Sequence, residues 1–172
     1  DMSGSNATKV TNMYQMFEQC ESLISVNLRN FNASNVTDMS YMFCYAKNFN
    51  EPLNSWNVSK VKNMRGMFQF ASSFNQPLDK WDVSSVENMS SMFYDAAAFS
   101  QNLDCWNVSK VKTMRFMFMY ARYFKDKPAW NVEHVEDVVG MYYGTQIVYV
   151  DPDLVCGIDP DLEKLAALES LD

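Results

Sequence analysis

The chain repeats one pattern about every 25 residues. An adjacent Met-Phe pair, replaced by Met-Tyr in the last copy, recurs with steps of 26, 25, 25, 25 and 24 residues. A unit of this length cannot bury its apolar side chains alone, so it must stack on its neighbours. The sequence therefore predicts an elongated solenoid, which weighs against a catalytic site. The pairs are Met16-Phe17, Met42-Phe43, Met67-Phe68, Met92-Phe93, Met117-Phe118 and Met141-Tyr142.

The repeat around Met92-Phe93 predicts two elements. Leu78, Trp81 and Val83 are the apolar positions of a short extended segment. Residues 86 to 99 then place apolar side chains at three- and four-residue steps, as on one face of a short helix. Parallel strands need a crossover, so we expect one strand and one helix per turn. An all-helical solenoid is the alternative, disfavoured because 25 residues are short for two helices.

Composition narrows the possible partners. The net charge is -7, but residues 1–150 carry 14 acidic and 13 basic residues, so the acidity belongs to the C-terminal segment. A nearly neutral body argues against nucleic-acid binding, which needs a clustered basic surface. The sequence has no apolar membrane span or signal peptide. Because the chain begins within a repeat, we expect it to be a segment of a longer protein, with any membrane anchor outside this segment.

The repeat motif resembles that of a known family. The string F-N-x-P-L-x-x-W-N/D-V-S-x-V-x-x-M-x-x-M-F-x-x-A is similar to the repeat of BspA-like leucine-rich-repeat surface proteins. More specifically, it is similar to the 25-residue subtype, a domain of unknown function common in mycoplasma lipoproteins and other microbial surface proteins. This resemblance implies an α/β repeat fold, a right-handed leucine-rich-repeat-like solenoid with one short parallel strand and one short helix per turn. It also implies a cell-surface location and no enzymatic activity.

Two recurring polar features have competing interpretations. The column Asn32, Asn57, Asp82, Asn107 and Asn131 fits side chains that satisfy backbone groups near a turn, or else a ligand-binding row. The Trp column of Trp56, Trp81, Trp106 and Trp130 is interpreted as core rather than as a glycan platform, because it shares a face with Val.

Basic residues recur two repeats apart, and they form the candidate binding patch of this chain. One interpretation is a surface for an anion or a glycan. The other is an alternating charge row, because Glu87 occupies the column of Lys62 and Lys112 in the intervening repeat. The patch residues are Lys60, Lys62, Arg65, Lys110, Lys112 and Arg115.

We predict no metal site, cofactor or catalytic residue. The four cysteines show no C-x-x-C spacing and are expected to be free thiols. His134 is the only histidine and has no candidate nucleophile column near it.

The sequence predicts two parts. Residues 1–145 form about six repeats, the last one degenerate, and residues 146–172 form a C-terminal cap. The cap would contain a terminal β-branched strand and an acidic helix with the apolar stripe Leu162, Leu165, Leu168 and Leu171.

These observations lead to two functional hypotheses. The first is a non-enzymatic, extracellular or cell-surface module for adhesion, which binds a host or neighbouring-cell protein or glycan. The second is a structural spacer that displays another domain and has no ligand of its own. A binder is expected to concentrate aromatic or charged residues on one face, whereas a spacer is not. We expect a mostly monomeric chain, with end-to-end association possible at the uncapped N-terminal end.

Overall fold

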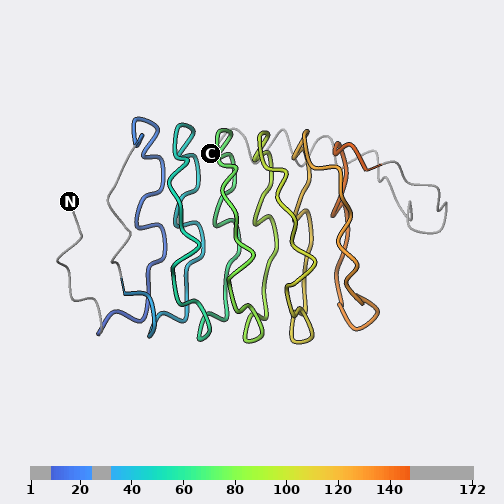
Figure 1. Ribbon diagram of the computed structural model, residues 1–172, viewed down its shortest axis with the longest axis horizontal. Coiled ribbons are helices and arrows are strands. Elements are labelled where there is room, and N and C mark those ends of the chain that lie inside the picture. Colours follow the sequence, from blue (N-terminus) through green and yellow to red (C-terminus); the bar gives the residue numbers. More distant parts are fainter. Residues whose placement is uncertain (1–8, 25–31, 148–172) are drawn as a thin grey trace.

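The chain winds into coils that lie side by side along one axis (Figure 1). The computed structural model describes residues 9–24 and 32–147. Isolated parallel β-bridges join each described coil to the next at equivalent positions, which confirms the repeat register. The bridges are Asn12–Asp38, Asp38–Asn63, Asn63–Asn88, Asn88–Thr113 and Thr113–Asp137. We number the coils 1 to 6 by these bridging residues, from Asn12 to Asp137.

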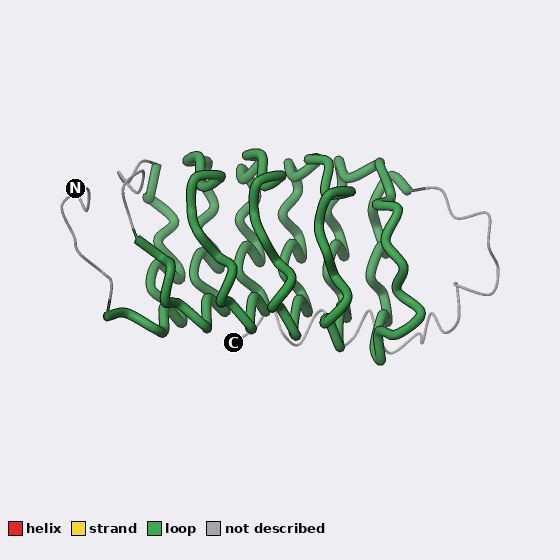
Figure 2. Tube along the Cα trace, turned by 60° about the horizontal axis from the view of Figure 1, so that its bottom comes forward, coloured by secondary structure: helices red, strands yellow, loops and turns green. Residues whose placement is uncertain are grey.

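The predicted strand-and-helix architecture is wrong. Residues 9–24 and 32–147 contain no helix, and their only β-structure is the single bridging residue of each coil (Figure 2). The segment expected to be a strand holds a turn instead, in which the Trp81 N–H donates to the Leu78 carbonyl at 3.1 Å. The fold is therefore not an α/β leucine-rich-repeat solenoid but a stack of coils built from turns.

A step of three residues explains why turns replace the helix. In coil 4 the N–H groups of Met92, Ala96 and Phe99 donate to carbonyls three residues earlier, at 2.9–3.2 Å. These bonds close single β-turns, whereas an α-helix bonds four residues back and places side chains every 3.6 residues. Apolar residues spaced by three therefore mark successive turns in this chain.

Backbone donors between these turns point along the stack. The N–H groups of Met89, Ser91 and Phe93 donate to carbonyls of coil 5 at 2.8–3.0 Å. Ser91, φ 55°, and Asp95, φ 49°, are in the left-handed conformation, which no α-helix contains. The polar backbone is thus satisfied between coils rather than along a helix.

Stacked aromatic columns form the core. Phe68, Phe93 and Phe118 are fully buried, and their rings stack at 5.5 and 5.6 Å between centroids. The predicted Trp column is also core: the Trp81 and Trp106 indoles lie 6.5 Å apart and nearly parallel. The indole N–H groups of Trp81, Trp106 and Trp130 each donate to a leucine carbonyl of the preceding coil, as between Trp106 and Leu78 at 3.0 Å. Burial of large rings whose indole N–H groups are satisfied makes this column structural.

The described structure ends shortly after coil 6. The Gln146 N–H donates to the Phe124 carbonyl at 3.0 Å, and Ile147 packs against the core. The predicted C-terminal cap, including its acidic helix, lies almost entirely outside the described residues.

Candidate binding face

The predicted charge row is present along the stack. Lys112 Nζ lies 2.6 Å from Glu87 Oε2, and Lys62 Nζ lies 4.0 Å from Glu87 Oε1. The hydrogen bond and charge of Lys112 lower the pKa of Glu87, and Glu87 raises the pKa of Lys112 in return. The structure therefore confirms that residues 25 apart are neighbours at this surface.

The remaining members of the predicted basic patch lie in different settings. Lys60 donates to Asn35 Oδ1 at 2.6 Å, and Lys110 lies near Asp82 and Glu87. The Arg65 guanidinium stands 5.7 Å from the centre of the Tyr41 ring. Arg115 stands 4.4 Å from the Phe116 ring and 3.6 Å from Asp137. The lysines thus pair with polar groups of the chain, while both arginines lie on aromatic rings.

The Asn/Asp column serves the backbone, as predicted. Asn57 and Asp82 accept backbone hydrogen bonds from Ser59 and Ser84, two residues further on, at 3.1 Å. A second column with the same role was missed in the sequence. Its members are the bridging residues themselves, as where the Ser90 N–H donates to Asn88 Oδ1 at 2.9 Å. Such Asx turns fix the chain direction at each corner of the coil.

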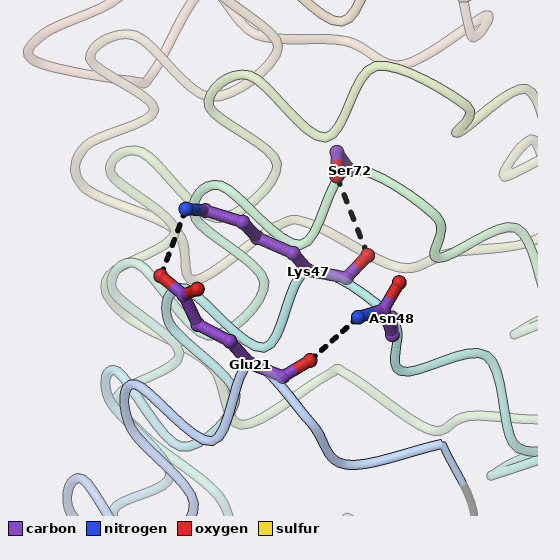
Figure 3. A network of polar contacts seen from close by, with 4 residues as sticks. All are labelled: Glu21, Lys47, Asn48 and Ser72. Atoms are coloured by element: carbon purple, nitrogen blue, oxygen red, sulfur yellow. Dashed lines mark hydrogen bonds and ion pairs between the residues drawn. The ribbon is translucent and has the colours of Figure 1, made fainter.

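A polar network joins the first three coils (Figure 3). Lys47 Nζ lies 2.8 Å from Glu21 Oε1, and Asn48 Nδ2 donates to the Glu21 carbonyl at 2.7 Å. The Ser72 hydroxyl donates to the Lys47 carbonyl at 3.3 Å. These exposed groups bond one another, so the network holds neighbouring coils in register rather than offering a ligand site.

One surface of the stack differs from the others, and we call it the turn face. Each described coil has two left-handed positions four residues apart, and the turn face consists of these positions and the residue before each. The inward pair Met92-Phe93 is fully buried, whereas Ser90-Ser91 before it is partly exposed. The left-handed residues are Gln15, Tyr41, Gly66, Ser91, Phe116 and Gly140 at the first position, and Gln19, Tyr45, Phe70, Asp95, Tyr120 and Gly144 at the second.

Eight aromatic side chains lie on the turn face outside the core cluster, and all but the exposed Tyr14 and the buried Tyr94 are half-buried. Several form a continuous series: Tyr45 stacks on Phe70 at 4.4 Å, Phe70 meets Tyr94 at 5.2 Å, and Tyr94 meets Tyr120 at 6.0 Å. We call the set the aromatic row. Its members are Tyr14, Tyr41, Tyr45, Phe70, Tyr94, Phe116, Tyr120 and Tyr143.

Burial on this face shifts two pKa values. Loss of hydration, with a smaller contribution from the charge of Glu18, raises the pKa of the Cys44 thiol to about 12. Loss of hydration also raises the pKa of Asp95, and the charge of Arg122 partly opposes it. The face is therefore shielded from water enough to penalise charge.

The turn face is where the repeats differ from one another. Core columns keep one residue type through the stack, as with Phe43, Phe68, Phe93 and Phe118. The second left-handed position instead reads Gln, Tyr, Phe, Asp, Tyr and Gly from coil 1 to coil 6. The sequence therefore did contain a signal for this face, because the residue type at these positions changes from repeat to repeat. Nothing in the sequence indicated that the variable positions lie on one surface.

Three further observations concern metal ligands, membrane helices and cysteines among the described residues. They contain no group of three or more His, Cys, Asp or Glu side chains placed to hold a metal ion. They also contain no helix with the length and apolar character to cross a membrane. Cys20, Cys44 and Cys105 are free thiols.

Comparison with known proteins identifies a family. No curated protein and no solved structure gave a significant match. The family described as "Mycoplasma protein of unknown function, DUF285" matches residues 1–83 and residues 56–152. Because these overlapping matches extend over most of the 172 residues, the chain belongs to this Mycoplasma family.

Proposed function

We propose that this chain is a non-enzymatic binding module of a cell-surface protein, and that it docks a protein partner on the turn face. The observation that carries the proposal is the aromatic row. Tyr and Arg are enriched at interfaces because they offer large contact area together with polar groups. On the turn face they are mixed with Ser and Gln, a composition close to that of antibody paratopes.

Backbone conformation supports the same face. Tyr45, Phe70 and Tyr120 are left-handed, with φ between 57° and 60°. A bulky residue in this region costs about 1–2 kcal/mol relative to a right-handed one. Glycine would avoid that cost, and it stands at the equivalent Gly144 of coil 6. Such strain at half-buried residues outside the core is typical of functional sites.

The way the rings pack favours a protein over a glycan. Glycan stacking requires free ring faces, but Phe70 has one face covered by Tyr45, and Arg115 stands over Phe116. Ring edges and guanidinium groups are what such a surface offers, and these suit side chains of a protein partner.

The cell-surface location rests on sequence resemblance. The repeat motif is similar to that of BspA-like leucine-rich-repeat surface proteins. We propose these proteins as more distant relatives, outside the DUF285 family. A purely structural spacer is the competing function, and the concentration of aromatics on one face speaks against it.

The experiment compares two triple variants of the full chain. The test variant is Tyr45→Ser, Phe70→Ser and Tyr120→Ser. The control variant is Lys80→Ser, Tyr123→Ser and Lys125→Ser, which changes exposed residues away from the turn face. Binding of fluorescently labelled protein to cultured epithelial cells is measured by flow cytometry, and circular dichroism melting checks that each variant folds.

We expect the wild type and the control variant to bind saturably, and the test variant to lose binding. Trypsin treatment of the cells should remove binding, whereas glycosidase treatment should not. If glycosidase treatment removes binding and trypsin treatment does not, the partner is a glycan rather than a protein. Absence of saturable wild-type binding would favour the spacer.

A further inference from the structure

Asp95 interrupts the run of aromatic residues at the second left-handed position, while Tyr94 keeps the aromatic row continuous beside it. At the second left-handed position the order from coil 2 to coil 5 is Tyr45, Phe70, Asp95 and Tyr120. Successive coils are bonded in register, since the Asp95 N–H donates to the Met119 carbonyl of coil 5 at 2.8 Å. Asp95 therefore stands in this column between Phe70 of coil 3 and Tyr120 of coil 5.

The Asp95 carboxylate has no direct partner within the described part of the chain. It is half-buried, yet among residues 9–24 and 32–147 its side chain accepts no hydrogen bond and forms no ion pair. The charge of Arg122 opposes the rise in the pKa of Asp95, but the two side chains form no ion pair within the described residues. Glu87, by contrast, is paired with lysines from both neighbouring coils. An unpaired carboxylate that has lost part of its hydration is a preferred place for a cation.

The aromatic rings of the residues next to Asp95 in the chain and in the column favour the same charge. Phe70 and Tyr94 meet at 66° with centroids 5.2 Å apart, and Tyr94 and Tyr120 meet at 90° with centroids 6.0 Å apart. The faces of aromatic rings are negative and attract Lys and Arg groups. One carboxylate beside apolar rings lacks the several oxygen ligands that Ca²⁺ or Mg²⁺ requires. The matching cation is therefore an organic one.

We propose that Asp95, with Phe70 and Tyr120 on either side, receives the guanidinium or ammonium group of an Arg or Lys side chain from the partner. This inference rests on the proposed function, because it names the chemistry that the turn face recognises. In this arrangement an ion pair forms at the centre of the turn face, and the surrounding rings exclude water from it.

The test titrates the isotope-labelled full chain with three capped amino acids and follows it by NMR. The probes are N-acetyl-arginine methylamide, N-acetyl-lysine methylamide and the uncharged N-acetyl-norleucine methylamide. We expect the arginine or lysine probe to give saturable shifts of the Asp95 carboxyl and the Phe70 and Tyr120 rings, with a dissociation constant on the order of millimolar. Shifts that match those with norleucine would overturn the inference.

Variants then separate the charge from the rings. Asp95→Asn should weaken binding of the basic probe about three- to tenfold, and Phe70→Leu about two- to fivefold. Asp126→Asn, at an exposed acid away from the turn face, should leave it unchanged. If Asp95→Asn binds the basic probe with full affinity, the role assigned to Asp95 is wrong. That conclusion would hold even if the triple variant of Tyr45, Phe70 and Tyr120 loses binding to cells. The proposed function can thus stand or fall separately from the role of Asp95.

Discussion

The Tyr41 ring lies directly over Gly66 of the next coil. A Cβ atom added to Gly66 would come within 2.5 Å of Tyr41 Cδ1, closer than packed atoms approach. Gly66 is left-handed with φ 59°, and Tyr41 itself has φ 56°. A large ring thus covers a position that has no side chain, and Phe116 over Gly140 repeats the arrangement.

Gly66→Ala should therefore destabilise the chain. The left-handed backbone alone should cost about 1–2 kcal/mol, and displacement of the Tyr41 ring adds to it. Urea unfolding measures the change. In a Tyr41→Ala background the same substitution should cost less, and the difference is the coupling between the two residues. Equal costs in both backgrounds would show that ring and glycine do not contact.

Phe93→Ala tests the core. Phe93 is fully buried, with Phe99 3.9 Å away and the rings of Phe68 and Phe118 stacked on either side. Its loss should cost about 3–5 kcal/mol, because these three rings lose a common neighbour. Tyr123→Ala is the control, since Tyr123 is 63% exposed, and it should change the free energy of unfolding by less than about 0.5 kcal/mol. Similar melting temperatures for the two variants would refute the core assignment.

The core and register could be predicted because they depend on repetition. Residues 25 apart must stack wherever the same apolar type recurs, so the Phe and Trp columns and the Lys62–Glu87–Lys112 row followed from the sequence. The helix was wrong because a step of three is close to 3.6, and hydrophobic period alone does not separate a short helix from successive turns.

The turn face could not be predicted, because it depends on conformations that its residues disfavour. The residue types of Tyr45, Phe70 and Tyr120 do not predict a positive φ, since aromatic residues rarely adopt one. The adjacent buried pair Met92-Phe93 was a usable signal: a strand would send the two side chains to opposite faces. Left-handed residues stand on both sides of this buried pair, at Ser91 and Asp95.

Glu87→Lys should weaken the charge row. The substitution places three cations in line, with successive coils about 5 Å apart, and the repulsion should lower the melting temperature at low salt. Added NaCl should restore much of the loss. Since the row lowers the pKa of Glu87, its contribution in the wild type is present at neutral pH and is lost as pH falls through the folded-state value. Glu133→Lys, at an exposed acid, is the control; equal salt dependence of both variants would argue against the row.

Cys44 should resist alkylation in the folded protein. With a pKa of about 12, only about one thiol in ten thousand is ionised near pH 8, and the thiolate is the reactive form. Iodoacetamide labelling followed by peptide mass spectrometry should therefore show Cys105, which is exposed, modified well before Cys44. In denaturant the two cysteines should react at similar rates. Rapid labelling of Cys44 in the native state would mean that this part of the turn face is open to water.

Asp95→Asn should raise the melting temperature at neutral pH. Because burial raises the pKa of Asp95 in the folded state, the folded chain binds this proton more readily than the unfolded chain. The charged carboxylate thus costs stability at pH 7, and the cost is relieved as pH falls through the folded-state pKa. Asparagine removes the charge and accepts the φ of 49°. Melting curves of wild type and variant should therefore converge toward about pH 3, whereas Asp126→Asn should track the wild type throughout. A wild type that is as stable as Asp95→Asn at pH 7 would show that the carboxylate is well solvated, and the argument for a cation at this position would lose its desolvation component.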